Sequence, residues 1–303
     1  MASVELWIQV LVLAVLQGVA ELFPISSLGH TVLVPGLLDW GNLTQQESFL
    51  PIVVTLHLGT AAALLVFYWR DWVALLRGGL AVLRARDLAA DADGKTLFLV
   101  IVGTIPAGIL GLVLEHPLER IFFAARFPLL TAAFLCLNGV ILLIGERTRQ
   151  RVEPKGLDRE RQEDAFHHIA DLTVPQALAI GLAQAAALIP GISRSGVTMV
   201  AGMRARLTHE EALRFAFLLA TPLIAAAGLL EVPKLAHAGA GVMAAALVGG
   251  VVAGIAALLS VVFLTRYFRI GRLTPFAYYS IGVGLVTFVI FAALSLGWIR
   301  LPW

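Results

Sequence analysis

Two short polar stretches interrupt apolar runs of this 303-residue chain: QGVAELFPISSLGH at residues 17–30 and PGISRSGVT at residues 190–198. Each stretch lies within a run that is otherwise apolar enough for a membrane-spanning helix, and each contains proline, glycine and serine. Non-helical backbone at membrane depth is tolerated only where protein or a water-filled cavity satisfies its N–H and C=O groups. The two breaks therefore predict one shared polar cavity inside a membrane protein.

Composition places the remainder of the chain in lipid. Hydrophobic residues make up 59% and charged residues 14% of the sequence, with a mean hydropathy of +0.88, whereas soluble domains carry about 25% charged residues. A net charge of +2 with basic residues between apolar runs argues against nucleic-acid binding. The single cysteine, Cys136, is expected to pack, so cysteines supply neither a disulfide framework nor a zinc site. The first basic residue is Arg70, so the N-terminal apolar run lacks the basic start of a signal peptide and is expected to remain.

Eight apolar segments have roughly the length that a bilayer-spanning helix needs. They cover about residues 5–38, 49–69, 97–114, 127–145, 174–203, 211–230, 239–265 and 275–299. The first and fifth segments contain the two breaks, and the residues around the breaks resemble each other at an offset of about 165 residues. The chain is therefore expected to be an all-α polytopic membrane protein made of two repeats, over residues 1–146 and 173–303, which a charged cytoplasmic loop over 147–172 joins.

The path of the broken segments decides how the repeats are oriented. If each broken segment dips into the membrane and returns, each half crosses three times, and the odd number inverts the second half. If the broken segments span fully, the repeats are parallel. Clusters of Lys and Arg follow the second, fourth, fifth and seventh segments, while residues 1–69 contain none. The re-entrant arrangement places all of these clusters in the cytoplasm, so we expect six transmembrane helices plus two re-entrant hairpins, with both termini outside.

The first break carries the parts of an activated nucleophile. Gln17 and Glu21 are spaced i, i+4 and share one helical face. Ionisable groups inside a membrane usually face a cavity or a partner, which makes Glu21 a functional candidate, the alternative being that it only tethers the loop. Ser26 and Ser27 precede a helix and could serve as an N-cap alone. The nearby His30 favours chemistry instead, because a hydroxyl, an imidazole and a carboxylate together can generate a nucleophile.

The second break supplies groups suited to an anion: Ser193, Arg194, Ser195, Gly196 and Thr198. The planar guanidinium of Arg194 matches phosphate oxygens bidentately. Glycine-rich backbone leading into a helix adds N–H donors. The pattern predicts a phosphate cradle. The alternative is that Arg194 forms an ion pair with Glu21 that joins two helices. The two interpretations are compatible if Arg194 pairs with Glu21 first and binds phosphate once substrate displaces Glu21.

Two other polar residues lie in apolar helices. For Asn138 we expect a hydrogen bond across to a neighbouring helix. For His57 two roles are possible, a hydrogen bond between helices or a part in the functional site, because it lies in the segment directly after the first break.

At these residues the sequence resembles the bacitracin-resistance family of undecaprenyl-diphosphate phosphatases, along nearly the whole chain. That family is marked by Glu/Gln-x-x-x-Glu, then Pro-Val-Ser-Ser and a His, and by Pro-Gly-x-Ser-Arg-Ser-Gly-x-Thr. The first motif matches Gln17, Glu21, Pro24, Ser26, Ser27 and His30, and the second matches residues 190–198. Three positions depart from the family: Gln17 is neutral where many relatives have Glu, Leu28 replaces a smaller or polar residue, and His57 stands where many have Gln.

The resemblance implies a hydrolase that removes the terminal phosphate of a C55 isoprenyl diphosphate at the outer face of the bacterial plasma membrane. It implies Ser27 as nucleophile, His30 as its acid/base partner, and Glu21 as a metal or proton-handling carboxylate. It also implies that Arg194 binds the diphosphate, and the further substrate-binding positions are Gln17, Ser26, Ser193, Ser195, Gly196 and Thr198. The implied cofactor is a divalent cation, Mg²⁺ or Ca²⁺, which the neutral Gln17 puts in doubt.

Several alternatives stay open at this point. The partners we expect are a polyprenyl diphosphate lipid and the bilayer, with no nucleic acid, and a homodimer is left open. A transporter or flippase of a phosphorylated lipid is the main rival, because broken helices in inverted repeats also mark secondary transporters. Hydrolysis is favoured, since a transporter has no need of a Ser/His pair beside an arginine clamp. The nucleophile is either Ser27 or a water that His30 activates.

Overall fold

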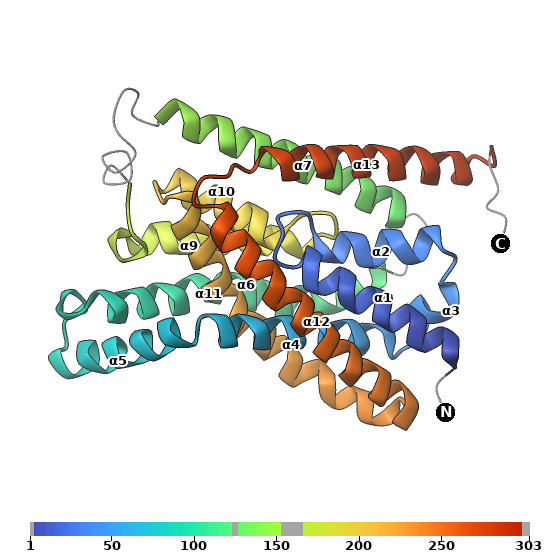
Figure 1. Ribbon diagram of the computed structural model, residues 1–303, viewed down its shortest axis with the longest axis horizontal. Helices are drawn as coiled ribbons and strands as arrows, with labels where there is room; N and C mark the ends of the chain where they lie inside the picture. The colour runs from blue at the N-terminus through green and yellow to red at the C-terminus, as the bar shows by residue number, and fades with distance from the viewer. Residues whose placement is uncertain (1–2, 123–126, 153–165, 299–303) are drawn as a thin grey trace.

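A computed structural model describes residues 3–122, 127–152 and 166–298, and these ranges are helical without a β-strand (Figure 1). The α-helices are α1 (Val4–Ala20), α2 (Ser27–Leu37), α3 (Gly41–Thr44), α4 (Phe49–Phe67), α5 (Trp69–Ala85), α6 (Ala92–Phe122), α7 (Phe127–Val152), α9 (Val174–Ala185), α10 (Arg194–Arg204), α11 (His209–Glu231), α12 (Ala240–Tyr267) and α13 (Thr274–Ser295). Short 3-10 helices are η1 (Leu88–Ala90), η2 (Ile169–Asp171), η3 (Ala186–Leu188) and η4 (Val232–His237). Residues 153–165 of the expected charged loop lie outside the described ranges.

Six of the described helices are long and apolar enough to cross a bilayer: α4, α6, α7, α11, α12 and α13. They coincide with the six unbroken segments of the sequence. Large apolar side chains cover their outer faces, with Leu229 80% exposed and Val289 64% exposed. Such faces are compatible with lipid and not with water.

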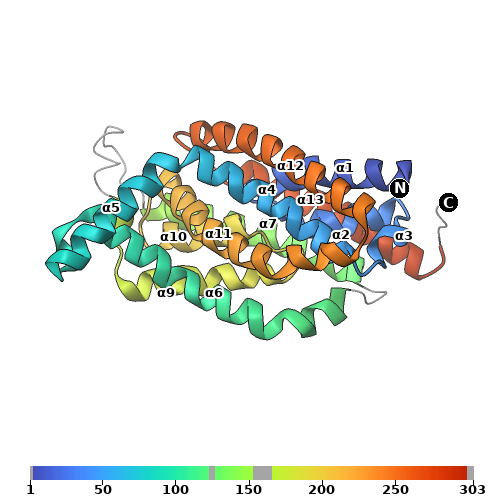
Figure 2. The same ribbon diagram turned by 90° about the horizontal axis from the view of Figure 1, so that it is seen from below.

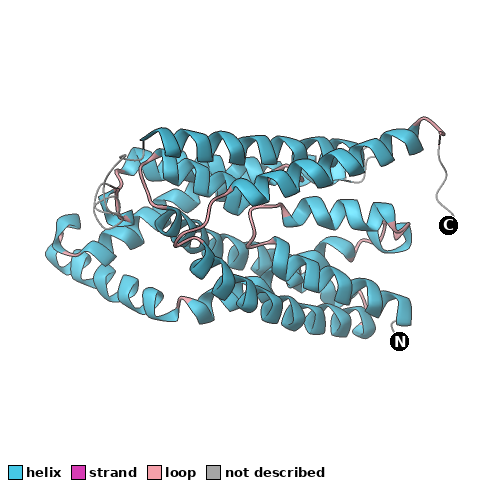
Figure 3. Cartoon of the chain, turned by 45° about the horizontal axis from the view of Figure 1, so that its top comes forward, coloured by secondary structure: helices cyan, strands magenta, loops and turns pink. Residues whose placement is uncertain are grey.

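The two remaining segments are broken where the sequence predicts. The helix α1 ends at Ala20 and α2 begins at Ser27, while α9 ends at Ala185 and α10 begins at Arg194. In Figure 1, α1 runs from the end of the molecule that holds the N-terminus to its middle, and α2 returns to that end. The helices α9 and α10 do the same from the opposite end, where α5 projects. Figure 3 shows the loops and turns between the helices in pink.

The region after the second segment differs from the expected loop. The helix α5 follows α4 with only Tyr68 between them, and it buries Leu75 and Gly78. A Cβ on Gly78 would lie 2.4 Å from the backbone nitrogen of Gly94, so α5 packs closely against the start of α6. The basic residues of this stretch therefore lie on an amphipathic helix. Charged residues on one face and leucines on the opposite face are the pattern that makes α5 an amphipathic helix.

Glycines let the long helices approach closely. The helix α12 packs along α4 and α1, as Figure 2 shows for α4, and α9 packs on α6. A Cβ on Gly59 of α4 would lie 1.8 Å from the carbonyl oxygen of Gly250 of α12. A Cβ on Gly181 of α9 would lie 1.9 Å from the carbonyl oxygen of Gly103 of α6. Small residues at such crossings are the usual means of packing helices in lipid.

Gly181→Ala is expected to lower the thermal midpoint of the detergent-solubilised protein, because the added methyl forces α9 away from α6 at a cost of about 1–3 kcal/mol. Gly111→Ala on α6 is the control, since a Cβ added there would meet no atom of another described segment within 4 Å. Alanine is the better helix former by roughly 1 kcal/mol, so the control keeps or raises the midpoint. Equal midpoints for the two variants would contradict the close crossing.

Candidate functional site

The two breaks meet. Ser26 Oγ accepts from the backbone nitrogens of Gly29 and Gly191, at 3.2 Å each. A Cβ on Gly29 would lie 3.1 Å from the Cα of Gly191, so the two chain segments touch there. Segments 165 residues apart thus form one buried unit, as the shared-cavity prediction requires.

Each short helix after a break begins with the same serine cap. Ser26 caps α2 through Gly29, and Ser193 caps α10 through Gly196, again at 3.2 Å. Ser26 and Ser193 occupy matching places in the two motifs. The N-termini of two helices therefore lie close together, and the partial positive charge of both favours an anion between them.

The backbone at the meeting point is held in unusual conformations. Ser26 has φ of 69°, in the region that residues with a Cβ rarely adopt. Gly191 has φ of 103°, and a Cβ there would lie 2.5 Å from the carbonyl oxygen of Thr131. Strained positions that the surrounding structure enforces are typical of functional sites.

Glu21 is the centre of the site. Its carboxylate is only 5% exposed and receives four side chains from four helices or their ends. Gln17 Nε2 donates to Oε2 at 2.9 Å, and the hydroxyl of Ser27 donates to the same oxygen. Arg194 Nη2 donates to Oε1, and His57 Nε2 lies 3.2 Å from Oε2. The carboxylate that the sequence marked as functional thus contacts the candidate nucleophile and the candidate phosphate clamp together.

His57 belongs to this cluster, which the sequence left open. Its Nδ1 lies 2.8 Å from the carbonyl oxygen of Val53, and its Nε2 faces Glu21. Both ring nitrogens therefore face oxygen atoms that can accept hydrogen bonds. His57 and Arg194 thus bring two basic side chains to one carboxylate. Only the proximity of α4 to the first break hinted at this in the sequence.

His30 and Ser27 share no side-chain hydrogen bond among the described residues, although the resemblance implies that the two act as partners. The helix α2 does begin at Ser27, but that hydroxyl is directed to Glu21. His30 Nδ1 lies 2.7 Å from the carbonyl oxygen of Ser26, and its Nε2 lies 2.9 Å from the hydroxyl of Tyr279. The physical reason is that a hydrogen bond to a buried carboxylate is stronger than one to a neutral imidazole.

The second break surrounds Arg194 with its own polar groups. Ser195 Oγ lies 3.2 Å from Ser193 Oγ and donates to the carbonyl oxygen of Phe23 at 3.2 Å. The guanidinium also reaches the carbonyl oxygen of Ala220 at 3.4 Å. Thr198 Oγ1 is buried and has no hydrogen-bond partner within the described residues. The predicted cradle residues thus lie in the first turns of α10, while the guanidinium itself contacts Glu21 and the Ala220 carbonyl.

Asn138 on α7 joins the two breaks. Its Nδ2 donates to the carbonyl oxygen of Pro24 at 3.1 Å and to Ser280 Oγ at 3.3 Å, and its Oδ1 accepts from the backbone nitrogen of Ser193 at 2.9 Å. The bond to Ser280 on α13 is the interhelical contact that the sequence predicts. The other two satisfy backbone groups that the breaks leave without helical partners.

The side chains around Glu21 include few that could bind a metal ion. Among the described residues, no group of three His, Cys, Asp or Glu side chains is placed to hold a metal ion. Gln17 Oε1, however, is buried beside Glu21 and has no hydrogen-bond partner in the described part of the chain. One carboxylate and one amide oxygen can serve a hard cation whose other ligands come from phosphate and water.

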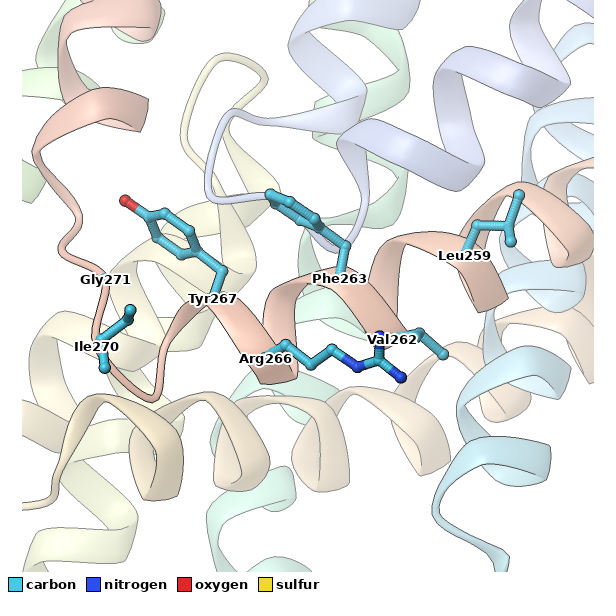
Figure 4. Close-up of a pocket in the computed structure, with 7 residues that line it drawn as sticks. All are labelled: Leu259, Val262, Phe263, Arg266, Tyr267, Ile270 and Gly271. Atoms are coloured by element: carbon cyan, nitrogen blue, oxygen red, sulfur yellow. The ribbon is translucent and has the colours of Figure 1, made fainter.

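A hollow of about 590 Å³ lies outside this cluster, at the end of α12 (Figure 4). Its lining is largely apolar and aromatic: Leu259, Val262, Phe263, Arg266, Tyr267, Ile270 and Gly271. Phe263 stacks on Phe23 of the first break at 5.8 Å between ring centroids. The hollow is open to the outside and holds none of the groups that contact Glu21.

Asn138→Leu keeps the side-chain volume but leaves the Ser193 N–H and the Pro24 carbonyl unpaired, at about 1–3 kcal/mol for each buried group. We expect a lower thermal midpoint than for Thr148→Val, whose hydroxyl bonds to the Ile144 carbonyl of its own helix. Midpoints that agree within error would show that Asn138 does not hold the breaks together.

Comparison with known proteins shows the family to which this chain belongs. Residues 10–286 match the family model described as "Bacitracin resistance protein BacA". A protein of Burkholderia pseudomallei named "Undecaprenyl-diphosphatase 1" is 48% identical over 282 residues, which cover 93% of this chain and 95% of that protein. "Undecaprenyl-diphosphatase 2" of Chromobacterium violaceum is 46% identical over 284 residues, covering 92% and 96%. "Undecaprenyl-diphosphatase" of Mycolicibacterium paratuberculosis is 45% identical over 293 residues, covering 92% and 95%. The chain is a multi-pass membrane protein that belongs to the bacitracin resistance protein family.

Proposed function

We propose that this protein hydrolyses undecaprenyl diphosphate to undecaprenyl phosphate and phosphate, which recycles the lipid carrier of cell-wall synthesis and gives resistance to bacitracin. The observation that carries the proposal is the contact of Glu21 with both the Ser27 hydroxyl and the Arg194 guanidinium, where two helix N-termini meet. The names of the relatives supply the lipid.

Substrate binding begins with an exchange of partners at Arg194. A diphosphate offers oxygens in the planar, bidentate arrangement that a guanidinium prefers. When Arg194 turns to the terminal phosphate, Oε1 of Glu21 loses its cation and the carboxylate becomes a better proton acceptor. The ion pair between Arg194 and Glu21 is then the resting state of the site, as the sequence allowed.

Ser27 is the nucleophile in this proposal. Its Oγ attacks the terminal phosphorus, the bond from that phosphorus to the bridging oxygen breaks, and the lipid monophosphate leaves. The hydroxyl proton passes to Glu21, which already accepts it as a hydrogen bond, and Glu21 then gives this proton to the departing lipid phosphate. Water attacks the phosphoserine and gives a proton to Glu21, which returns it to Ser27 Oγ as the bond from phosphorus to Oγ breaks and phosphate leaves. The N-termini of α2 and α10 stabilise the negative charge in both steps.

This scheme assigns to Glu21 the base role that the resemblance implied for His30, and His30 holds the backbone beside the reacting Ser27 through its hydrogen bond to the Ser26 carbonyl. The alternative, in which His30 activates a water and Ser27 only binds phosphate, remains open. His30 in this structure has Tyr279 on Nε2 and would need that atom free to accept a proton from water.

A divalent cation is part of the proposal as a second source of positive charge. Glu21 and the unpaired Oε1 of Gln17 would hold it. Bound there, a cation neutralises phosphate oxygens and the departing lipid phosphate. None of the steps above depends on it, because Arg194 and the helix N-termini already face the phosphate.

We also propose an orientation. The helix pairs α1–α2 and α9–α10 are re-entrant hairpins of two inverted repeats, the six long helices cross the membrane, and both termini and the site open to the periplasm. The support is twofold. The described ends of the chain lie at one end of the molecule, and α5 with its basic residues lies at the other (Figure 1). Basic residues gather on the cytoplasmic side of membrane proteins.

Arg194→Lys is expected to lower phosphate release by about 10²–10³-fold, because it keeps the charge but loses the bidentate fork. Arg204→Lys is the control, since Arg204 lies exposed in the last turn of the same helix. Malachite-green detection of phosphate from undecaprenyl diphosphate in detergent measures both. Phosphate release near the wild-type rate by the Arg194→Lys variant would show that Arg194 only joins helices through its ion pair with Glu21.

Ser27→Ala is expected to lower turnover by about 10³-fold or more, because it removes the attacking atom. Ser260→Ala is the control, since Ser260 is a buried serine of α12 whose hydroxyl donates to the Ala256 carbonyl. When turnover of substrate labelled on its terminal phosphate is quenched, label should remain on the wild-type protein and not on the Ser27→Ala variant. Substantial turnover by Ser27→Ala would eliminate the serine mechanism and leave activated water.

The orientation predicts that a cysteine at Ser3 reacts with an impermeant maleimide in intact cells, in a background without Cys136. A cysteine at Ala89, an exposed position in the turn between α5 and α6, should react only after the inner membrane is opened. The reverse pattern would place both termini in the cytoplasm.

A further inference from the structure

Tyr279 is the side chain that contacts His30 from α13. Its hydroxyl lies 2.9 Å from His30 Nε2, and the two rings stack with centroids 5.8 Å apart and planes 17° from parallel. His30 is 5% exposed, whereas Tyr279 is 42% exposed and lies on α13, which is long and apolar enough to cross a bilayer. Tyr279 thus connects the surface of α13 to the buried His30.

The hydrogen bonds define which atom of His30 carries the proton. The Ser26 carbonyl can only accept, so Nδ1 is the N–H that donates to it. In the neutral ring Nε2 is then the acceptor, and the Tyr279 hydroxyl donates to it. Both polar atoms of the imidazole are engaged, and the Tyr279 hydroxyl fixes the tautomer whose Nδ1–H donates to the Ser26 carbonyl.

Other ionisable groups of the site do not share this position. His57 and Arg194 both contact Glu21, and the Glu21 carboxylate accepts from the Ser27 hydroxyl of α2. On α7 the neutral Asn138 bonds the backbone of both breaks. In the described contacts, Tyr279 is the ionisable group that faces His30.

We propose that Tyr279 is a positioning residue for the hydrolysis, which fixes His30 in its neutral Nδ1–H tautomer at the seam between α2 and α13. The inference rests on the proposed function, because it assigns a part in that reaction. The hydroxyl sets the orientation and proton state of His30, while the Tyr279 ring forms the boundary between the site and the lipid side, from which an isoprenyl diphosphate approaches.

The experiment compares Tyr279→Phe with Tyr278→Phe in the detergent phosphate-release assay, over a range of pH. Tyr278 is the matched control, because it is the neighbouring tyrosine, is 62% exposed, and has no hydrogen bond among the described contacts. Phenylalanine keeps the ring stack and removes only the hydroxyl. We expect kcat of Tyr279→Phe to fall about threefold to tenfold with KM unchanged, as for the loss of one hydrogen bond.

The pH profile separates positioning from packing. The Tyr279 hydroxyl donates to neutral His30, and its removal makes the neutral form less stable relative to the protonated form. The part of the kcat–pH profile that reports on His30 should therefore move to higher pH. The same change in a His30→Gln background should have no further effect on kcat or on the profile, since Tyr279 acts through His30.

Three outcomes decide the matter. A wild-type kcat and pH profile in Tyr279→Phe, or an equal further loss in the His30→Gln background, would overturn the assignment. Should Tyr279→Phe unfold, the same comparison is made with 3-fluorotyrosine at 279 and at 278, which keeps the hydroxyl and changes its acidity. A profile that does not respond at 279 then overturns the proposal. Absence of phosphate release by the wild-type protein would instead reject the proposed function itself.

Discussion

A single buried carboxylate organises this protein. An ionised Glu21 in the interior of a membrane protein costs several kcal/mol unless it is paired. The partners that neutralise it come from α1, from the start of α2, from α4 and from the start of α10. Because those elements belong to both halves of the chain, satisfying one charge brings both breaks to the same place.

The breaks themselves create a second demand, which the surrounding residues meet. Backbone groups freed from helical pairing must find partners at a depth where water is scarce. Two serine caps, the Asn138 amide and the close approach at Gly191 supply them. The same arrangement leaves two helix N-termini facing one point. The proposed anion site therefore follows from how the two breaks satisfy their backbone hydrogen bonds, and the proposed reaction adds to it the Ser27 hydroxyl and the Arg194 guanidinium.

Local patterns were sufficient to predict the elements of the fold. Apolar run length located the six long helices, and Pro, Gly and Ser located the breaks within the first and fifth segments. The pairing of Arg194 with Glu21 could also be predicted from the sequence, because opposite charges inside a membrane protein must pair. The amphipathic helix α5 was missed, since arginines between apolar segments were interpreted as a loop when they also fit one face of a helix.

Contacts between side chains were harder to predict, because they depend on where helices cross. Spacing alone allowed Ser27 to meet His30, but the nearby carboxylate of Glu21 takes the Ser27 hydroxyl. His57 reaches Glu21 from α4, and Tyr279 reaches His30 from a helix 249 residues along the chain. No periodicity carries such information. The roles of these residues in the reaction stay predictions.

In the proposed reaction, Glu21 holds Arg194 only until a diphosphate takes its place. A structure of the protein with a lipid methylene-diphosphonate, which cannot be hydrolysed at the bridging position, tests this exchange. We expect the terminal phosphonate to bind between the N-termini of α2 and α10. Its oxygens should lie within hydrogen-bond distance of the Arg194 guanidinium and its phosphorus should face Ser27 Oγ, with Arg194 separated from Glu21. A bound headgroup away from both helix N-termini, with the ion pair of Arg194 and Glu21 intact, would contradict it.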